Sequence, residues 1–145
     1  MLYLIVGCAD NADETVKAQT NYSLYKMANL NVWHSKLMAR VEAGGPVGDC
    51  LVWTGATSSR GYGMMRVRWT DGQSRVMGVH QLGMMCALQS TQFPYGYNVS
   101  HLCHNKLCIT VGHLSLEPNW ANSQRASCLR EGTCFGHAGF KRCIL

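Results

Sequence analysis

The chain has 145 residues, of which 47% are hydrophobic, and its formal net charge is +5 at pH 7. This length fits one domain, and no apolar run is long enough to cross a membrane as a helix, so we expect no membrane association. The mildly basic balance permits nucleic-acid binding through phosphate contacts, although a solvated basic surface would have the same composition. The eight cysteines exceed an average share but fall below the density of a disulfide-rich scaffold.

The first half of the chain begins with a weakly patterned segment. We expect residues 1–29 to form a loosely ordered lead-in with one short helix, ahead of a single domain over residues 30–145. Apolar residues recur at helical intervals from position 30 to 41, which predicts a helix that ends at the Gly-Gly-Pro sequence of positions 44–46. Residues 50–56 predict a short strand.

A β-hairpin is predicted around the Asp-Gly pair at positions 71 and 72, because this pair favours a tight turn between two strands. In the first strand of the hairpin, three apolar residues alternate with Arg66 and Arg68. Successive strand residues point to opposite faces, so one face should be apolar and the other should carry two guanidinium groups.

The second half of the chain predicts a further helix, two short strands and a last helix. Residues 80–89 have helical periodicity. Strands are expected over residues 98–102 and 112–116, and Pro118 suits the first turn of a helix that runs to about Ser127. The expected fold class is therefore α+β, with small antiparallel sheets and flanking helices. The buried side of the helix over residues 80–89 should consist of Leu82, Met85, Cys86 and Leu88.

Cysteine and histidine gather in the last third of the chain, where residues 101–143 hold five of the eight cysteines and four of the six histidines. Thiolate and imidazole are the ligands that hold Zn²⁺ in a closed tetrahedral shell, and two Cys₃His shells can be drawn here. Cys50 is the best fourth donor for the first, because it would tie an early strand to the cysteine-rich loop. His104 could compete with His113 as a ligand. The expected structural zinc ligands are Cys50, Cys103, Cys108 and His113 in the first shell, and Cys128, Cys134, His137 and Cys143 in the second.

Two polar residues of the same region are not needed by zinc. His101 should share a strand face with Cys103, and Asn122 should lie about one turn into the last helix. A strand, a zinc loop, a second strand and a helix would fold them toward each other in a ββα-metal arrangement. A neutral imidazole can then take a proton from water, and an amide oxygen can help to hold one Mg²⁺. Each residue taken alone could instead be structural.

The stretches SHLCHNKLC, GHLSLE and NWANSQR resemble the His-Cys box of the intron-encoded homing endonucleases. Upstream, CLVWTGATSSRGYGMMRVR and VHQL resemble the related HNH-type endonucleases of phages and mobile introns. The resemblance covers about residues 33–143. It implies a ββα-metal nuclease core with His101 as general base, Asn122 as magnesium ligand and the two Cys₃His sets as structural zinc sites. In the second set the family's Cys-x-His step is Cys-x₂-His here.

The same resemblance implies that an arginine on the sheet binds the cleaved phosphate. Arg75 is the first choice because it lies just before VHQL, and Arg66 and Arg68 are alternatives. The family's antiparallel sheet enters the major groove of DNA. Family members dimerise through a tail beyond the second zinc, and this chain ends two residues after that site. A homodimer would therefore need another surface, such as the helix around Trp33. The candidate DNA contacts are Arg66, Arg68, Arg75 and Arg125.

Together these features predict a Mg²⁺-dependent endonuclease that hydrolyses double-stranded DNA, with two structural zinc ions and one catalytic magnesium ion. Two alternatives stay open. One is a zinc-folded DNA-binding module without catalysis, and the other is a nonspecific nuclease of the same ββα-metal class. Clustered thiols that bind metal stay reduced inside cells, so we expect an intracellular protein, in the nucleus or wherever its target DNA lies.

Overall fold

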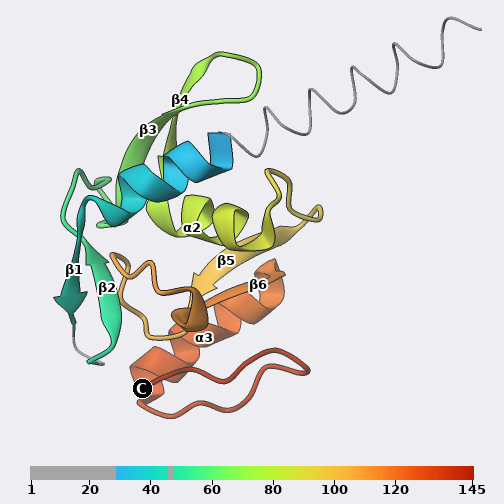
Figure 1. Cartoon of the computed structure of the whole chain (residues 1–145). Helices are drawn as coiled ribbons and strands as arrows, with labels where there is room; N and C mark the ends of the chain where they lie inside the picture. Colours follow the sequence, from blue (N-terminus) through green and yellow to red (C-terminus); the bar gives the residue numbers. More distant parts are fainter. Residues whose placement is uncertain (1–28, 46–47) are drawn as a thin grey trace, which may run out of the picture.

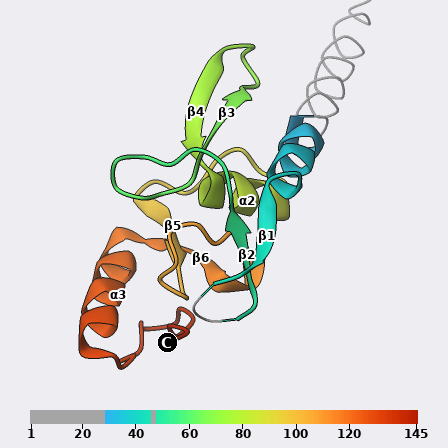
Figure 2. The same cartoon turned by 90° about the vertical axis from the view of Figure 1, so that its left-hand side faces the viewer.

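The structure, a computed structural model, describes residues 29–45 and 48–145. The expected lead-in lies outside the described residues except for its last position. Within the described ranges the strands form three two-stranded antiparallel sheets with helices beside them, which confirms the predicted α+β class. In Figures 1 and 2 the hairpin of β3 (Met64–Arg68) and β4 (Ser74–Gly78) lies at the opposite end from helix α3 (Asn119–Glu131), with helix α2 (Val79–Leu88) between them.

The first described helix is shorter than predicted. Residues 29–38 are helical, and the chain then enters strand β1 (Val41–Gly44), which pairs with β2 (Cys50–Trp53). The carbonyl of Arg40 accepts hydrogen bonds from the amide and the hydroxyl of Thr54 at 2.9 and 3.0 Å. These bonds fix Arg40 in the β1–β2 region. A strand starts at Cys50 as predicted but ends at Trp53, three residues earlier than expected, and β1 was missed.

The helix over residues 29–38 packs onto the hairpin through Leu30, Trp33 and Leu37, each 1% exposed. The indole Nε1 of Trp33 donates to the carbonyl of Arg68 at 3.2 Å, and its ring stacks on that of Trp69 with 5.2 Å between centroids. Trp33 is therefore part of the core, and a dimer surface on the exposed side of this helix stays a prediction.

The β3–β4 hairpin forms where the Asp-Gly pair predicts it. The amide of Gln73 donates to Oδ1 of Asp71 at 2.9 Å, and Gly72 has a φ of 80°, a conformation that favours glycine. The alternation of β3 is also confirmed: Met65 and Val67 are buried, and Arg66 and Arg68 are exposed.

Helix α2 closes the main core, with Leu82 fully buried and Met85 and Cys86 nearly so. Leu88 is 50% exposed, which contradicts the predicted buried side. The helix ends at this residue, and Gln89 then adopts a left-handed conformation with a φ of 51°, so the last turn projects past the core.

The last three elements form a ββα unit. Strand β5 (Tyr97–His101) pairs antiparallel with β6 (Leu114–Pro118), and α3 follows directly after Pro118. The second strand starts two residues later than predicted, because residues 111–113 form a single 3₁₀ turn. This turn places His113 beside Cys103 and Cys108 of the preceding loop. Gly132, with a φ of 67°, terminates α3.

Replacing Leu37 by alanine should destabilise the domain by about 2–5 kcal/mol, because it removes a fully buried side chain and leaves a cavity. The neighbouring Met38, 42% exposed on the same helix, provides the control. Met38→Ala should change the free energy of unfolding by less than about 0.5 kcal/mol. Urea unfolding at a fixed zinc concentration measures both, and equal losses would contradict the packing described.

Candidate active site and metal centres

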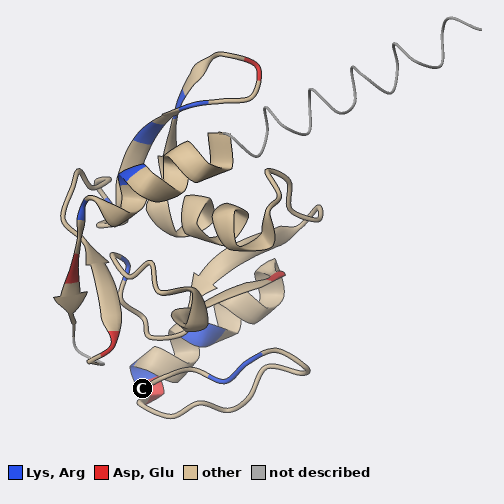
Figure 3. Cartoon of the chain, viewed as in Figure 1, with Lys and Arg blue, Asp and Glu red and all other residues tan. Residues whose placement is uncertain are grey.

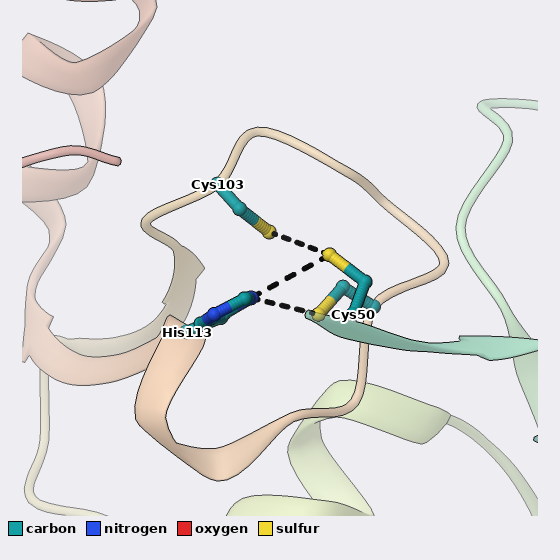
Figure 4. A group of neighbouring side chains, drawn as sticks. Cys50, Cys103 and His113 are labelled. Carbon is teal, nitrogen blue, oxygen red and sulfur yellow. Dashed lines mark hydrogen bonds between the residues drawn. The ribbon is translucent and has the colours of Figure 1, made fainter. Parts of the chain in front are cut away.

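The first metal centre joins an early strand to a late loop. Cys50 comes from β2, Cys103 and Cys108 from the loop after β5, and His113 from the 3₁₀ turn. Figure 4 shows Cys50, Cys103 and His113 pointing toward one another from these three segments. All four ligand atoms, counting Cys108, lie within 4.8 Å of one another.

The distances within this group fit zinc. Ordinary Zn–S and Zn–N bonds in a tetrahedron place two sulfurs about 3.8 Å apart and a sulfur and a nitrogen about 3.5 Å apart. The Sγ atoms of Cys50 and Cys103 are 3.8 Å apart. Nδ1 of His113 lies 3.5 Å from Sγ of Cys50 and 3.6 Å from Sγ of Cys108. A disulfide would require about 2.05 Å between sulfurs, so these thiols are arranged for a metal.

One of these thiols is readily ionised. Hydrogen bonds from Cys103 and then Thr110, working against burial, lower the pKa of Cys108 to about 4. Zinc binds the thiolate, so a thiol that is already deprotonated at neutral pH favours the site.

The loop that carries Cys108 is attached to β2 along its length. Val52 forms a bridge with Cys108, and the amide of Ile109 donates to the carbonyl of Leu51 at 2.9 Å. The hydroxyl of Thr110 accepts from the amide of Leu51 at 2.7 Å. The zinc loop therefore pairs with β2. Backbone hydrogen bonds to β2, as well as the thiol in the metal site, fix the position of Cys108.

The second metal centre lies at the C-terminal end of α3. Nε2 of His137 is 3.6 Å from Sγ of Cys128 and 3.4 Å from those of Cys134 and Cys143, again the separations of a tetrahedral site. Nδ1 of the same ring faces Oε1 of Gln124 at 3.4 Å. An amide oxygen only accepts, so this contact keeps the hydrogen on Nδ1 and leaves Nε2 free to bind metal.

Both predicted ligand sets are thus brought together, and the extra residue in the Cys-x₂-His step is accommodated. Against the opposing effect of burial, amide donors from Cys143 and Gly136 lower the pKa of Cys134 to about 7. Each shell is completed by four protein ligands, so both centres are structural.

A buried ion pair connects the second centre to the β5–β6 sheet. Glu117 on β6 accepts two hydrogen bonds from Arg125 on α3, at 2.7 and 2.6 Å, and both side chains are almost fully buried. Arg125 also donates to the carbonyl of Lys141 at 2.9 Å and contacts Sγ of Cys143 at 3.4 Å. Its guanidinium is committed to these internal partners. We therefore correct its assignment from a DNA contact to a structural link.

His101 lies at the end of β5, 9% exposed, and its Nε2 is 3.1 Å from the carbonyl oxygen of Cys108. A carbonyl only accepts, so Nε2 carries the hydrogen and Nδ1 holds the free lone pair. Burial, followed by repulsion from His80, lowers the pKa of His101 to about 3. The imidazole is therefore neutral at physiological pH.

His101 and Asn122 line the same cavity, which has a volume of about 590 Å³. His80 lies beside His101 with 4.7 Å between ring centroids, and burial lowers its pKa to about 4. The rings of Tyr62 and His104 also face this space, so His104 turns away from the metal. The cavity therefore collects neutral imidazoles and an exposed amide, although the role of each residue stays a prediction.

Helix α3 carries two neighbouring rows of side chains: one is buried beside the second metal centre, and the other lines the cavity. Ala121, Arg125 and Cys128 are its buried residues, at helical spacing. The adjacent positions Asn122, Ala126 and Leu129 line the cavity. The ion pair of Arg125 therefore fixes the rotation of α3 that presents Asn122.

Arg75 does not line this cavity. It lies opposite Val67 in the hairpin register, near the turn, where it stacks over the ring of Trp69 at 4.7 Å and pairs with Asp71. Arg66 and Arg68 occupy the opposite face of the hairpin. The structure therefore places Arg75 outside the cavity lined by His101, and its role at the cleaved phosphate stays a prediction.

Arg60 and Lys106 line the cavity, as does Arg125, whose guanidinium is already paired with Glu117. Nζ of Lys106 donates to the carbonyl of Arg60 at 3.0 Å and lies 5.1 Å from the ring centroid of Tyr62. Sequence reasoning missed both, although Lys106 lies between two predicted zinc ligands and Arg60 precedes the Gly-Tyr-Gly turn.

Comparison with protein families gives a match that agrees with this geometry. The model of a family described as the zinc-binding loop region of homing endonuclease matches residues 49–142. The chain belongs to this family. The homing-endonuclease match contains seven of the eight zinc ligands, together with His101 and Asn122, and stops one residue before Cys143.

Two proteins similar to this chain are protein 2.8 and protein 7.7 of Escherichia phage T7. Each is 32% identical to it, over 74 and 78 residues respectively. The aligned parts cover 51% and 52% of this chain and 46% and 53% of the relatives, so the chain spans about half the length of the relatives it matches. No solved structure matches the chain. Among the described residues, no helix combines the length and apolarity needed to span a bilayer.

The purified protein should contain two zinc ions per chain, because two complete Cys₃His shells are present. Cys134→Ser should lower this to one by weakening the second shell. Cys86→Ser changes a buried thiol outside both shells and should leave two. Zinc released by a chelator from the reduced protein can be counted with a colorimetric dye. Equal zinc contents in the two variants would exclude the second centre.

Replacing Arg125 by methionine should destabilise the protein by about 3–5 kcal/mol, because it leaves the carboxylate of Glu117 buried without its partner. The double variant Glu117→Gln/Arg125→Met should recover part of this loss. Denaturant unfolding at constant zinc measures both effects. A loss that persists undiminished in the double variant would show that Arg125 acts through some contact other than Glu117.

Proposed function

We propose that this protein is a Mg²⁺-dependent endonuclease that hydrolyses phosphodiester bonds of double-stranded DNA. One observation carries the proposal: a neutral, buried imidazole and an exposed carboxamide line one cavity next to a structural zinc loop. Membership of the homing-endonuclease zinc-loop family supports a nuclease. DNA as substrate and magnesium as cofactor are parts of the proposal.

His101 acts as the general base. Its Nε2–H is held by the carbonyl of Cys108, which leaves the lone pair of Nδ1 to accept a proton from water. The water oxygen attacks phosphorus, the P–O3′ bond breaks, and the leaving 3′ oxygen takes a proton from solvent. Because the Cys108 carbonyl belongs to the zinc loop, the ring keeps a fixed orientation through the reaction.

Asn122 would hold the magnesium ion. Its amide oxygen is a hard donor of the kind that Mg²⁺ accepts, and no carboxylate is found among the described residues that line the cavity. This donor set fits an ion whose other ligands are water and DNA oxygens, as Mg²⁺ at phosphate sites commonly has. When bound, Mg²⁺ neutralises charge on the phosphate and the leaving oxygen.

Arg60 provides the protein's cation at the cleaved phosphate, with Lys106 beside it. Both line the cavity, and Arg60 is exposed at its rim. A guanidinium can donate two parallel hydrogen bonds to a phosphate. Arg60 therefore replaces Arg75 in the role that an arginine was expected to fill.

His101→Ala should reduce the rate at which the zinc-loaded protein nicks a supercoiled plasmid in Mg²⁺ by about 10²–10⁴-fold, the usual contribution of a general base. Asn122→Ala should also lower the rate, because it removes one ligand and so lowers the affinity for Mg²⁺. A higher Mg²⁺ concentration should therefore partly restore the rate. Conversion of supercoiled to open-circular and linear DNA on a gel measures both.

Matched controls are available on the same kinds of element. His34 is an exposed histidine on the helix over residues 29–38, and Asn119 starts α3 outside the cavity. His34→Ala and Asn119→Ala should keep wild-type rates. If wild-type protein that carries both zinc ions shifts DNA on a gel without nicking it, the nuclease proposal is excluded and a non-catalytic DNA-binding module remains. Degradation to short fragments would instead assign a nonspecific nuclease.

A further inference from the structure

A second cavity lies between the helix over residues 29–38 and the β3–β4 hairpin. Its volume is about 550 Å³. Ala39, Ala56, Trp53 and Met65 give it an apolar floor, and Trp53 and Met65 are themselves buried core residues. Nothing in the proposed chemistry of His101 and Asn122 uses this space.

Three cations surround this cavity: Lys36 on the helix, Arg40 after it, and Arg66 on β3. All three side chains are exposed, and no carboxylate occurs among the described residues that line the cavity. In Figure 3 the basic positions form a row from β3 across the end of this helix to the start of β1. The surface is therefore complementary to an anion.

The second cavity adjoins the first. Met64 lines both of them, and Arg66 lies two residues further along the same face of β3. A chain of negative charges that has one group beside His101 can thus continue over Met64 toward Arg66, Arg40 and Lys36. The two cavities then form one track with the cleavage site at one end.

We propose that this second cavity binds the sugar–phosphate backbone of DNA at a nucleotide beyond the cleaved bond. The proposal rests on the proposed nuclease function. Its new element is the pair Lys36 and Arg40, which lies on the N-terminal side of the segment matched to the homing-endonuclease family. The contact is made to the backbone, so it contributes affinity and register for any DNA sequence.

The mixed lining favours a backbone over a free anion. Inorganic phosphate would gain the cations but no use of the apolar floor. A deoxyribose–phosphate unit offers both an anion and a face of C–H groups, which can rest on the exposed side chains of Ala39 and Ala56. Each phosphate neutralised by a lysine or arginine releases counterions, so this binding must weaken as salt rises.

The test compares Lys36→Ala/Arg40→Ala with Arg130→Ala/Lys141→Ala. Each double variant removes two positive charges, but Arg130 and Lys141 are exposed residues that line neither cavity. Fluorescence anisotropy of a labelled duplex, with zinc present and Mg²⁺ absent, gives the dissociation constant across a salt series. The slope of log K against log salt should fall by about 2 in the first variant only.

A parallel series in inorganic phosphate at matched ionic strength separates the two anion sources. Loss of phosphate-specific displacement in Lys36→Ala/Arg40→Ala, with the affinity and salt slope for DNA unchanged, would assign the cavity to free phosphate and overturn the backbone contact. Equal slopes for wild type and both double variants would also overturn it, as would equal losses in the two variants. In each of these cases His101-dependent nicking by wild-type protein would leave the nuclease proposal standing. A wild type that binds no DNA would remove both.

Discussion

The arrangement of this molecule depends on one tetrahedral site that joins β2 to the loop after β5. Cys108 has two separate tasks there, because its thiol completes the metal shell while its carbonyl holds the Nε2–H of His101. A single residue thereby couples the metal to the orientation of the candidate base. The free energy of zinc binding, of order 10–16 kcal/mol for such sites, becomes folding free energy in a region with few large apolar side chains. Metal therefore replaces the hydrophobic packing that would otherwise have to hold this ring in place.

The second zinc site acts on the other wall of the cavity. It anchors the C-terminal end of α3, and the Glu117–Arg125 pair fixes the rotation of the same helix against β6. A buried ion pair is costly to desolvate and adds little net stability, but its geometry is specific. Here the ion pair determines which face of α3 packs against β6, and Asn122 lies on the adjacent face, which lines the cavity. The two zinc sites thus position opposite walls of one cavity, and neither need take part in chemistry.

Much of this arrangement could be predicted from local patterns. Ligand spacing identified both metal shells, period-two alternation identified the exposed Arg66 and Arg68, and the Asp71-Gly72 pair located the hairpin. Failures came where tertiary contacts decide the outcome. From its sequence Arg125 is expected to be an exposed cation on its helix, but in the structure it pairs with the buried Glu117. Arg75 precedes α2 in the sequence, and the hairpin register places it on the face opposite to Arg66 and Arg68. Arg60 and Lys106 reach the cavity only because the zinc loop folds onto the turn before β3, a contact between segments 46 residues apart.

The composition of the cavity also limits when the proposed enzyme can work. Its described lining offers imidazoles held neutral by burial, the exposed amides of Asn98 and Asn122, and no carboxylate to attract a divalent ion in the absence of substrate. In the proposed reaction, phosphate oxygens would complete the ligand set, so metal and DNA would bind cooperatively, each raising the affinity of the other by the same factor. Backbone contacts distant from the cleaved bond then gain importance, because they hold the phosphate at the site long enough for the ion to bind. The proposed contact to the cavity lined by Arg66, Arg40 and Lys36, which shares Met64 with the cavity of His101, would provide such a distant hold on the backbone.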